Sequence, residues 1–251
     1  MGAMKGVILS INPSVQIVDI THDIPPQDIE AGAFDLLASY KAFPASTIHL
    51  AVIDPGVGSN RRPLLIQCAE QFFVGPDNGI FSWIYEREAK FRATQLSNEK
   101  FFRHPVSTTF HGRDIFAPVA AALSTGIPIE EFGHEVKDVV RLESLAPKTA
   151  GANVVEGRLI HIDRFGNCIT NLTRDHLRED PSDSRPKLVV NDREITSFHR
   201  YFAEGENDES ELFCLFGSAG FLEVAARKSS AARILNARRG QSAVLISGHG
   251  D

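Results

Sequence analysis

Charged and polar side chains follow a short apolar run in the first quarter of the chain. Residues 54–62 read Asp-Pro-Gly-Val-Gly-Ser-Asn-Arg-Arg, after a strand-like segment at 48–53. In an open α/β sheet, ligands bind beyond the carboxyl ends of strands, and glycines let the backbone approach them closely. Asp54 suits a base or an orienting carboxylate, and equally a turn cap. Arg61 and Arg62 suit anion stabilisation, or simply a solvated loop.

Two further polar clusters lie downstream. Residues 110–114 read Phe-His-Gly-Arg-Asp at the start of a predicted helix, and residues 163–167 read Asp-Arg-Phe-Gly-Asn. His111, in a glycine-containing polar segment, suits a functional role as well as a structural one. Asp163 and Asn167 suit ligand binding, and also an ordinary β-turn with a side-chain cap. Three such clusters in one globular chain predict one small-molecule site.

Composition excludes several classes of protein. The chain has 251 residues, 43% of them hydrophobic, and a net charge of −6. A core is therefore expected, and no basic block suggests a phosphate-binding surface for nucleic acid. No apolar run reaches the roughly 18 residues of a membrane span, and the first residues do not resemble a signal peptide, so we expect a cytoplasmic protein. Three widely spaced cysteines predict reduced, buried thiols.

No pair of His or Cys residues has metal-ligand spacing, and no phosphate-binding loop or nucleophile elbow is present. From the residues alone, we therefore expect a metal-free α/β enzyme whose site contains an Asp, an Arg and a His.

Two domains are predicted from a change in the pattern of strand-like and helix-like segments along the chain. Residues 1–150 alternate strand-like and helix-like segments, which favours an α/β domain with a mostly parallel sheet. Residues 151–251 contain strand-like runs separated by turns, which favours a mostly β, barrel-like domain. Segment 147–151 is expected to be a linker, with the domain boundary near 150–153. Within this scheme, the predicted strands are 16–20, 48–53, 64–68, 72–74, 154–162, 187–190, 212–216 and 242–246, the predicted helices are 29–43 and 114–123, and the predicted polar loops are 178–185 and 204–209.

Seven segments in order resemble one family. They are MKGVILSINP (4–13), IVDITHDIPPQDI (17–29), VIDPGVGSNRR (52–62), VGPDNG (74–79), TFHGRDIFAPVAA (109–121), HIDRFGNCITN (161–171) and GSAGFLEVA (217–225). Together they resemble the S-adenosylmethionine hydroxide adenosyltransferases, also called S-adenosylmethionine hydrolases, which are relatives of the fluorinase and chlorinase. The matches span nearly the whole chain.

The resemblance implies an enzyme that hydrolyses S-adenosylmethionine to adenosine and methionine, with no cofactor. It implies an N-terminal α/β domain, a C-terminal β-barrel, and a homotrimer whose active sites lie between the N-terminal domain of one subunit and the C-terminal domain of its neighbour. It assigns a triad to Asp54, Arg61 and His111, and an acid followed by glycines points to water rather than halide. The positions that match substrate-binding ones are Phe110, Asp163, Phe165, Asn167 and Ser218.

One departure from the family pattern produces a further expectation. The family opens with a strand and a Thr-Asp-Phe-Gly type turn whose Asp binds the ribose hydroxyls, whereas this sequence starts at what reads as the following helix. We therefore expect no counterpart of that Asp and one interior strand fewer. Two alternatives stay open: a non-catalytic homologue that binds S-adenosylmethionine or a nucleoside, and a halide-using adenosyltransferase. The member of the triad that takes the proton also stays open.

Overall fold

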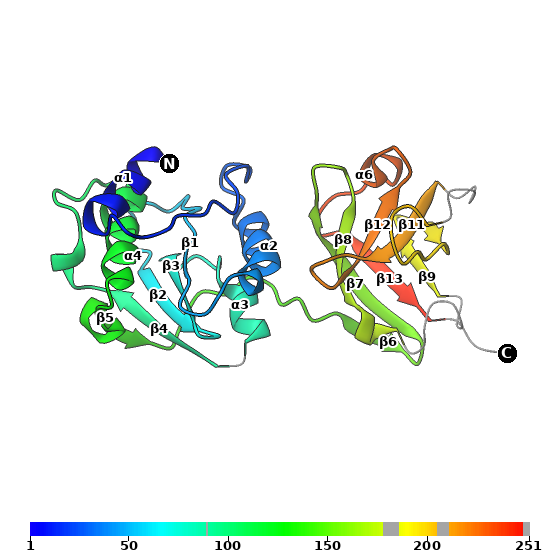
Figure 1. Ribbon diagram of the computed structural model, residues 1–251. Helices are drawn as coiled ribbons and strands as arrows, with labels where there is room; N and C mark the ends of the chain where they lie inside the picture. Colours follow the sequence, from blue (N-terminus) through cyan, green and yellow to red (C-terminus); the bar gives the residue numbers. More distant parts are fainter. Residues whose placement is uncertain (89, 178–185, 205–210, 248–251) are drawn as a thin grey trace. The chain divides into compact units, whose positions relative to one another are not determined.

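The computed structural model describes residues 1–88, 90–177, 186–204 and 211–247. They form two compact units, Met1–Ser144 and Leu145–Asp251 (Figure 1). The predicted linker contains a strand instead, because residues 148–151 pair with the strand that follows them. The predicted loop 178–185, and residues 205–209 of the second predicted loop, lie outside the described residues.

The first unit is a sheet with helices on both faces. Its strand order is β1-β3-β2-β4-β5. Side chains alternate along β3, so Val74 packs on one face with Val119 of α4, while Phe73 contacts Tyr40 on the other. Its strands are β1 (Ile48–Leu50), β2 (Pro63–Cys68), β3 (Gln71–Pro76), β4 (Phe91–Leu96) and β5 (Gly133–Val136). Its helices are α1 (Gly2–Ile11), α2 (Ile29–Ser39), η1 (Tyr40–Ala42), α3 (Ser82–Arg87), η2 (Glu99–Phe101), η3 (Gly112–Phe116), α4 (Ala117–Ser124) and η4 (Ile129–Phe132).

The predicted helix over 29–43 is confirmed as α2 followed by η1. Asp28 caps it, because its Oδ1 accepts the backbone N–H of Ala31 at 3.0 Å. The predicted helix over 114–123 is also confirmed, although it starts as the short π-helix η3 before α4.

The α/β fold class is confirmed, but the sheet is mixed rather than mostly parallel. Among the described strands, β1 and β3 are parallel, whereas β2–β3, β2–β4 and β4–β5 are antiparallel. The reason is local: Ala69 and Glu70 both have positive φ angles, of 51° and 60°, which is the conformation of a tight hairpin turn. Such a turn reverses the chain, so β3 returns beside β2.

The predicted strand at 16–20 does not form. This segment and β1 both line a cavity of about 1030 Å³ in the first unit. No ladder of backbone hydrogen bonds joins the two segments, so residues 16–20 stay outside the sheet. In the described sheet β1 has one neighbour, β3. Val18 consequently leaves 65% of its surface exposed.

The second unit is an antiparallel, nearly closed sheet, which confirms the barrel-like prediction. Its strand order is β10-β9-β13-β7-β8-β12-β11, with β6 paired to β7. The ends of this order meet where Ser197 and His199 exchange backbone hydrogen bonds with Cys214 of β11, both at 2.8 Å. Its strands are β6 (Lys148–Gly151), β7 (Val154–Ile162), β8 (Cys168–Thr173), β9 (Lys187–Val190), β10 (Arg193–Ile195), β11 (Leu212–Phe216), β12 (Phe221–Ala226) and β13 (Ser242–Ile246), and its helices are η5 (Arg174–His176) and α6 (Ala231–Ile234).

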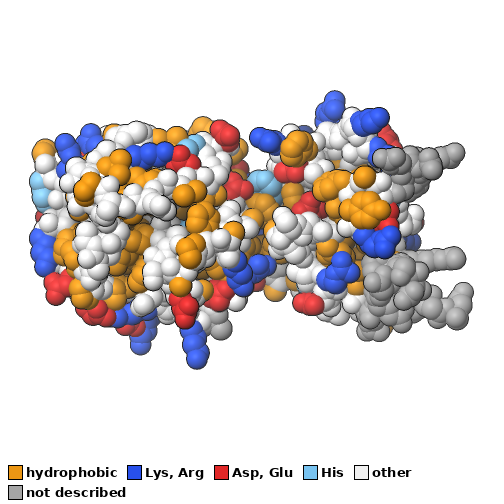
Figure 2. Space-filling model, viewed as in Figure 1, with side chains coloured by type: hydrophobic (Ala, Val, Ile, Leu, Met, Phe, Trp, Pro, Cys, Tyr) orange, Lys and Arg blue, Asp and Glu red, His pale blue; other side chains and the backbone are white. Residues whose placement is uncertain are grey.

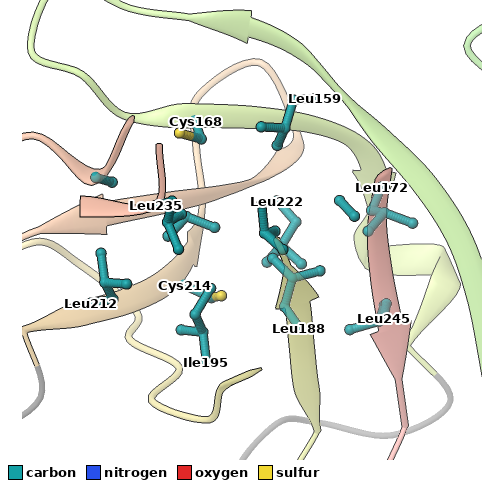
Figure 3. Close-up of a cluster of buried hydrophobic side chains, with 14 residues drawn as sticks. Leu159, Cys168, Leu172, Leu188, Ile195, Leu212, Cys214, Leu222, Leu235 and Leu245 are labelled. Atoms are coloured by element: carbon teal, nitrogen blue, oxygen red, sulfur yellow. The ribbon is translucent and has the colours of Figure 1, made fainter. Parts of the chain in front are cut away.

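The interior of the second unit is apolar and well filled. Figure 3 shows Leu188, Leu222 and Leu245 converging from separate strands, in a cluster that also contains Cys168 and Cys214. These two cysteines and Cys68 are free and buried, as predicted. Burial raises the pKa of the Cys68 thiol to about 11 and that of Cys168 to about 12, so both stay protonated at neutral pH.

An ion-pair clamp fixes the polar loop that follows β1. Arg62 donates from Nε and Nη2 to Oδ2 of Asp77, at 2.9 and 2.6 Å, and from Nη1 to Asp138 at 2.8 Å. The Asp77 side chain is only 3% exposed, and it also accepts the backbone N–H of Val140. Arg62 is therefore a structural residue that ties the loop to the end of β3 and to the segment around 138.

Removal of this clamp should destabilise the first unit. Arg62→Ala leaves the buried carboxylate of Asp77 without its cation, which costs roughly 1–3 kcal/mol of unfolding free energy. The measurement is urea unfolding followed by fluorescence of Trp83, the only tryptophan in the chain, which is buried in this unit. Lys100→Ala is the matched control, because Lys100 pairs with Glu131 at an exposed site and should cost less than about 1 kcal/mol. Equal urea midpoints for the two variants would contradict a stabilising role of the Arg62 ion pairs.

Candidate active site

Asp54, Arg61 and His111 form one hydrogen-bonded set. Arg61 Nε donates to Asp54 Oδ1 at 2.8 Å, its Nη2 donates to Asp54 Oδ2, and the same Nη2 lies 2.8 Å from His111 Nδ1. The side chains of Arg61 and Asp54 are 9% and 7% exposed. The guanidinium also lies over the ring of Phe116, 5.1 Å from its centroid. The sequence-predicted triad is thus brought together in the first unit.

The contact with Arg61 fixes the protonation of His111. A guanidinium only donates hydrogen bonds, so the Nδ1 atom facing it must be an acceptor, and the ring proton lies on Nε2. Burial and the charge of Arg61 lower the pKa of His111 below its ordinary 6.5, against weaker opposite effects of Asp54 and Asp114. His111 is therefore neutral at pH 7 and presents an N–H donor at Nε2.

A glycine lets the loops that carry the triad approach one another. Gly58 has a φ of +79°, and a Cβ atom built there would lie 2.3 Å from the carbonyl oxygen of Thr108. No other residue fits this backbone conformation and this distance. The loop after β1, with Asp54 and Arg61, consequently packs against the loop that leads to His111.

A buried carboxylate organises the second of these loops. Asp114 is fully buried and accepts hydrogen bonds from the side chains of Arg103 and Arg113 and from the backbone N–H of Ser107. The hydrogen bond from Arg113 is the main cause that lowers the pKa of Asp114 to about 2. Asp114 was expected near a helix start, and it lies inside the π-helix η3. Phe110, predicted to bind substrate, is half-buried beside it.

Three of the predicted substrate-binding residues share one turn in the second unit. Asp163 Oδ1 accepts the backbone N–H groups of Phe165 and Asn167, both at 2.9 Å, and its Oδ2 accepts the Asn167 side-chain amide. This is the side-chain-capped turn that the sequence also allowed. It leaves Phe165 66% exposed, so this ring is available to a ligand.

Ser218 lies in a separate turn of the second unit, between β11 and β12. It is exposed, and Gly217 before it lies directly against a carboxylate, because a Cβ on Gly217 would meet Glu223 Oε1 at 1.6 Å. Burial, and then the nearby charge of Asp163, raise the pKa of Glu223 to about 7. Glu223 thus lies near both turns that carry predicted binding residues.

Sequence reasoning did not identify three of these carboxylates. Asp77 and Asp114 appeared only as parts of motifs, and Glu223 was not singled out. For Glu223 the available signal was a charge inside an otherwise apolar stretch, Phe-Leu-Glu-Val-Ala. Buried acids usually have a specific partner.

We searched the described residues for metal ligands and one face of the molecule for charged patches. Within the described ranges, no group of three or more His, Cys, Asp or Glu side chains could hold a metal ion. On the face shown in Figure 2, Lys and Arg side chains are interspersed with Asp and Glu rather than gathered in one basic field. No helix in the described part of the chain is long and apolar enough to cross a membrane.

Comparisons with known proteins cover both units. A family model described as the SAM hydroxide adenosyltransferase N-terminal domain matches residues 1–133, and the corresponding C-terminal domain matches residues 157–244. An (R)-S-adenosyl-L-methionine hydrolase of Methanocaldococcus jannaschii is 35% identical, over 94% of this chain and 86% of its own length. A fluorinase of an Actinoplanes species is 28% identical, over 70% of this chain and 67% of its own.

A solved structure agrees with these matches. An uncharacterised conserved protein of Thermotoga maritima superposes with a TM-score of 0.87 and 33% sequence identity, over 98% of this chain and 94% of that one. The matched segments include the loops that carry Asp54, Arg61 and His111. The chain belongs to the SAM hydroxide adenosyltransferase family.

Proposed function

We propose that this protein hydrolyses S-adenosyl-L-methionine to adenosine and L-methionine. The observation that carries the proposal is the hydrogen-bonded set of Asp54, Arg61 and His111, in a chain whose curated relatives include several named (R)-S-adenosyl-L-methionine hydrolase. A buried cation between an acid and a neutral imidazole is suited to holding a water molecule and stabilising its hydroxide character.

The reaction needs little chemical assistance. The sulfonium of the substrate is an activated leaving group, so a water oxygen can attack C5′ of the ribose while the C5′–S electron pair returns to sulfur. The enzyme's task is to align water and ribose in line and to exclude other solvent, and alignment can contribute roughly 7–11 kcal/mol. A sulfonium requires no Lewis acid and no leaving-group acid, so we propose that no metal or cofactor takes part.

The triad geometry favours one division of roles. His111 carries its proton on Nε2 and is engaged at Nδ1, so in this arrangement it orients the water as a donor and does not accept its proton. Asp54 uses one lone pair on each oxygen to bind Arg61, and a carboxylate has further lone pairs for the proton that leaves. We propose that Asp54 accepts this proton, and that Arg61 stabilises the developing hydroxide.

Residues of both units are proposed to bind the substrate. Aromatic rings at Phe110 and Phe165 suit stacking on adenine. The carboxylate and amide of Asp163 and Asn167 and the hydroxyl of Ser218 suit the polar groups of the nucleoside or the amino acid.

Product analysis tests the proposed reaction. The purified protein is incubated with S-adenosylmethionine and EDTA, and the nucleosides are separated by chromatography. Adenosine and methionine in equal amounts are expected. A 5′-halogenated nucleoside that appears with added chloride or fluoride would favour the halide-using alternative, S-adenosylhomocysteine would indicate methyl transfer, and binding without turnover would favour the non-catalytic homologue. Activity lost with EDTA and restored by a metal would contradict metal independence.

We also propose that the protein is cytoplasmic and that it forms a homotrimer, the second of which the resemblance implies. Light scattering should give three times the chain mass of 27.6 kDa. If neighbouring subunits complete each site, an Arg61→Ala chain co-refolded with an Asn167→Ala chain should regain part of the activity that each variant alone has lost. A fully active monomer would contradict the trimer.

Arg61→Ala should lower turnover by about 10²–10³-fold, because it removes a preorganised donor at the nucleophile. The affinity for substrate should change less, since a positive sulfonium gains nothing from a nearby cation. Steady-state kinetics of Arg61→Ala and Arg62→Ala, each measured on the folded fraction, make the test. The neighbouring Arg62→Ala should affect stability and leave turnover of the folded fraction within about threefold. If Arg62→Ala lost turnover while Arg61→Ala stayed fully active, the catalytic role would belong to Arg62 and not to Arg61.

Turnover should be lost at acidic pH through a group whose pKa lies below 6.5. His111 accepts a hydrogen bond from Arg61 only when neutral, and its pKa is lowered in the folded protein. As the pH falls through that lowered pKa, the ring gains a proton at Nδ1, faces Arg61 as a second cation and loses the contact. The measurement is the pH profile of kcat/KM, in which this loss appears as a falling limb on the acidic side. In His111→Gln, whose amide does not titrate, the limb should disappear, and its persistence would assign it to another group.

A further inference from the structure

The Arg61 guanidinium lies on an aromatic ring that is not part of the triad. Its central carbon is 5.1 Å from the centroid of the Phe116 ring, within the range of a cation–π contact. The hydrogen bonds to Asp54 and His111 all use Nε and Nη2, which form one edge of the guanidinium plane. Hydrogen bonds along one edge restrain tilting of the plane only weakly, so the contact with its face completes the orientation.

The ring under the guanidinium is itself fixed in the core. Phe116 is fully buried, and it belongs to an apolar cluster with Leu65 and Val74 of the sheet and Val119 of α4. The Arg61 side chain above it is only 9% exposed. A cation–π contact is stronger where the cation is desolvated. Phe116 therefore gives the guanidinium a rigid support from which water is excluded.

The π-helix η3 explains how one short segment makes two contacts with Arg61. His111 and Phe116 are five residues apart, and in an α-helix such positions lie about 140° apart around the axis. At η3 the backbone N–H of Ala117 donates to the carbonyl of Gly112, which is a hydrogen bond between residues five apart. This wider turn brings positions five apart toward the same side. The imidazole consequently reaches an edge of the guanidinium, and the phenyl ring reaches its face.

We propose that Phe116 is a positioning residue that holds the Arg61 guanidinium in the plane where it contacts both Asp54 and His111. The inference rests on the proposed function in one respect, namely that these three residues activate water. If the guanidinium tilted away from the ring, the single hydrogen bond to His111 should be lost first, because the pair with Asp54 has two.

Steady-state kinetics of Phe116→Leu test this role. Leucine keeps the position apolar but removes the aromatic face that the cation contacts. We expect kcat for S-adenosylmethionine to fall about five- to thirtyfold, as for the loss of a desolvated cation–π contact. KM should change less than about twofold, because the ring is buried beneath the triad. An unchanged kcat would overturn the proposal.

Phe132→Leu is the matched control, because Phe132 is buried in the same apolar cluster but packs on Phe101, with 4.5 Å between the ring centroids, and not on the triad. Its urea midpoint should fall about as much as that of Phe116→Leu, while its kcat stays within about twofold of the parent value. Equal losses of kcat in the two variants would mean that Phe116 only stabilises the core, and would refute the positioning role.

A fluorinated ring separates the electrostatic contact from packing. Trifluorophenylalanine at position 116, introduced by stop-codon suppression, nearly keeps the shape of the ring but weakens the negative charge on its face. We expect kcat to fall at least about threefold. The same residue at position 132 should leave kcat within about twofold of the parent value. If both positions tolerate the fluorinated ring equally, the contact with Arg61 is packing alone and the proposal fails.

The protonation of His111 is a readout that a merely structural role would not move. Burial, and then the charge of Arg61, lower the pKa of His111, whereas Asp54 and Asp114 act in the opposite direction. If Phe116→Leu lets the guanidinium move away, this pKa should rise toward 6.5, and the acidic limb of kcat/KM should shift to higher pH. Nitrogen-15 NMR titration of the ring measures the pKa. A pKa and a limb equal to those of the parent would contradict the role.

A double variant tests whether Phe116 acts through Arg61. In the Arg61→Ala background, Phe116→Leu should change kcat by less than about twofold, because the cation that the ring supports is gone. Phe132→Leu should have the same small effect in both backgrounds. Full additivity of Arg61→Ala and Phe116→Leu would show that Phe116 acts by another route, and would count against the proposal.

Failure of this inference can be told apart from failure of the proposed function, because the NMR titration needs no turnover. If the protein leaves S-adenosylmethionine intact, and the pKa of His111 nevertheless rises in Phe116→Leu, the hydrolase is refuted and the positioning role is kept. If the protein forms adenosine normally, and Phe116→Leu changes neither kcat nor the pKa of His111, only the positioning role is refuted.

Discussion

The candidate site depends on one buried cation shared between an acid and an imidazole. A guanidinium can only donate, so each group that it contacts must be an acceptor. Arg61 thereby binds the Asp54 carboxylate and faces the unprotonated Nδ1 of a neutral His111, whose proton lies on the outer nitrogen. One side chain thus sets the hydrogen-bonding direction of both neighbours, and any role for them in activating water follows from that.

The rest of the first unit serves to hold this cation. A salt bridge costs free energy to bury, so its partners must be placed accurately by the surrounding structure. Arg62 anchors the loop to Asp77, Gly58 allows the neighbouring loop to approach closely, and Asp114 braces the segment that carries His111. The adjacent arginines of one motif thus have different partners: Arg61 contacts Asp54 and His111, where we propose a chemical role, and Arg62 contacts Asp77 and Asp138.

Much of this arrangement could be predicted from the sequence, because periodicity and ordered motifs report local structure and family. The α/β and barrel classes and the meeting of Asp54, Arg61 and His111 are confirmed. The apolar runs did not show whether neighbouring strands are parallel or antiparallel. For β2 and β3 the positive φ angle of Ala69 in the turn between them makes the chain reverse, so the two strands are antiparallel. The strand predicted at 16–20 was wrong, because a strand needs a neighbouring strand for its backbone hydrogen bonds. The apolar pattern of the segment itself does not show whether that neighbour exists. The buried carboxylates are stabilised by arginines that can lie far away in the sequence. The spacing of residues in a motif does not reveal such pairs.

The proposed division of roles in the triad depends most directly on the protonation of His111 in the folded protein. Nitrogen-15 NMR of the imidazole rings, assigned by comparison with His111→Gln, distinguishes the two neutral tautomers and the cation. At pH 7 we expect a neutral ring with Nδ1 unprotonated and Nε2 protonated, and Arg61→Ala should remove this preference. A ring protonated at Nδ1, or an imidazolium at pH 7, would contradict the shared hydrogen bond from Arg61 and with it the proposed division of roles in the triad.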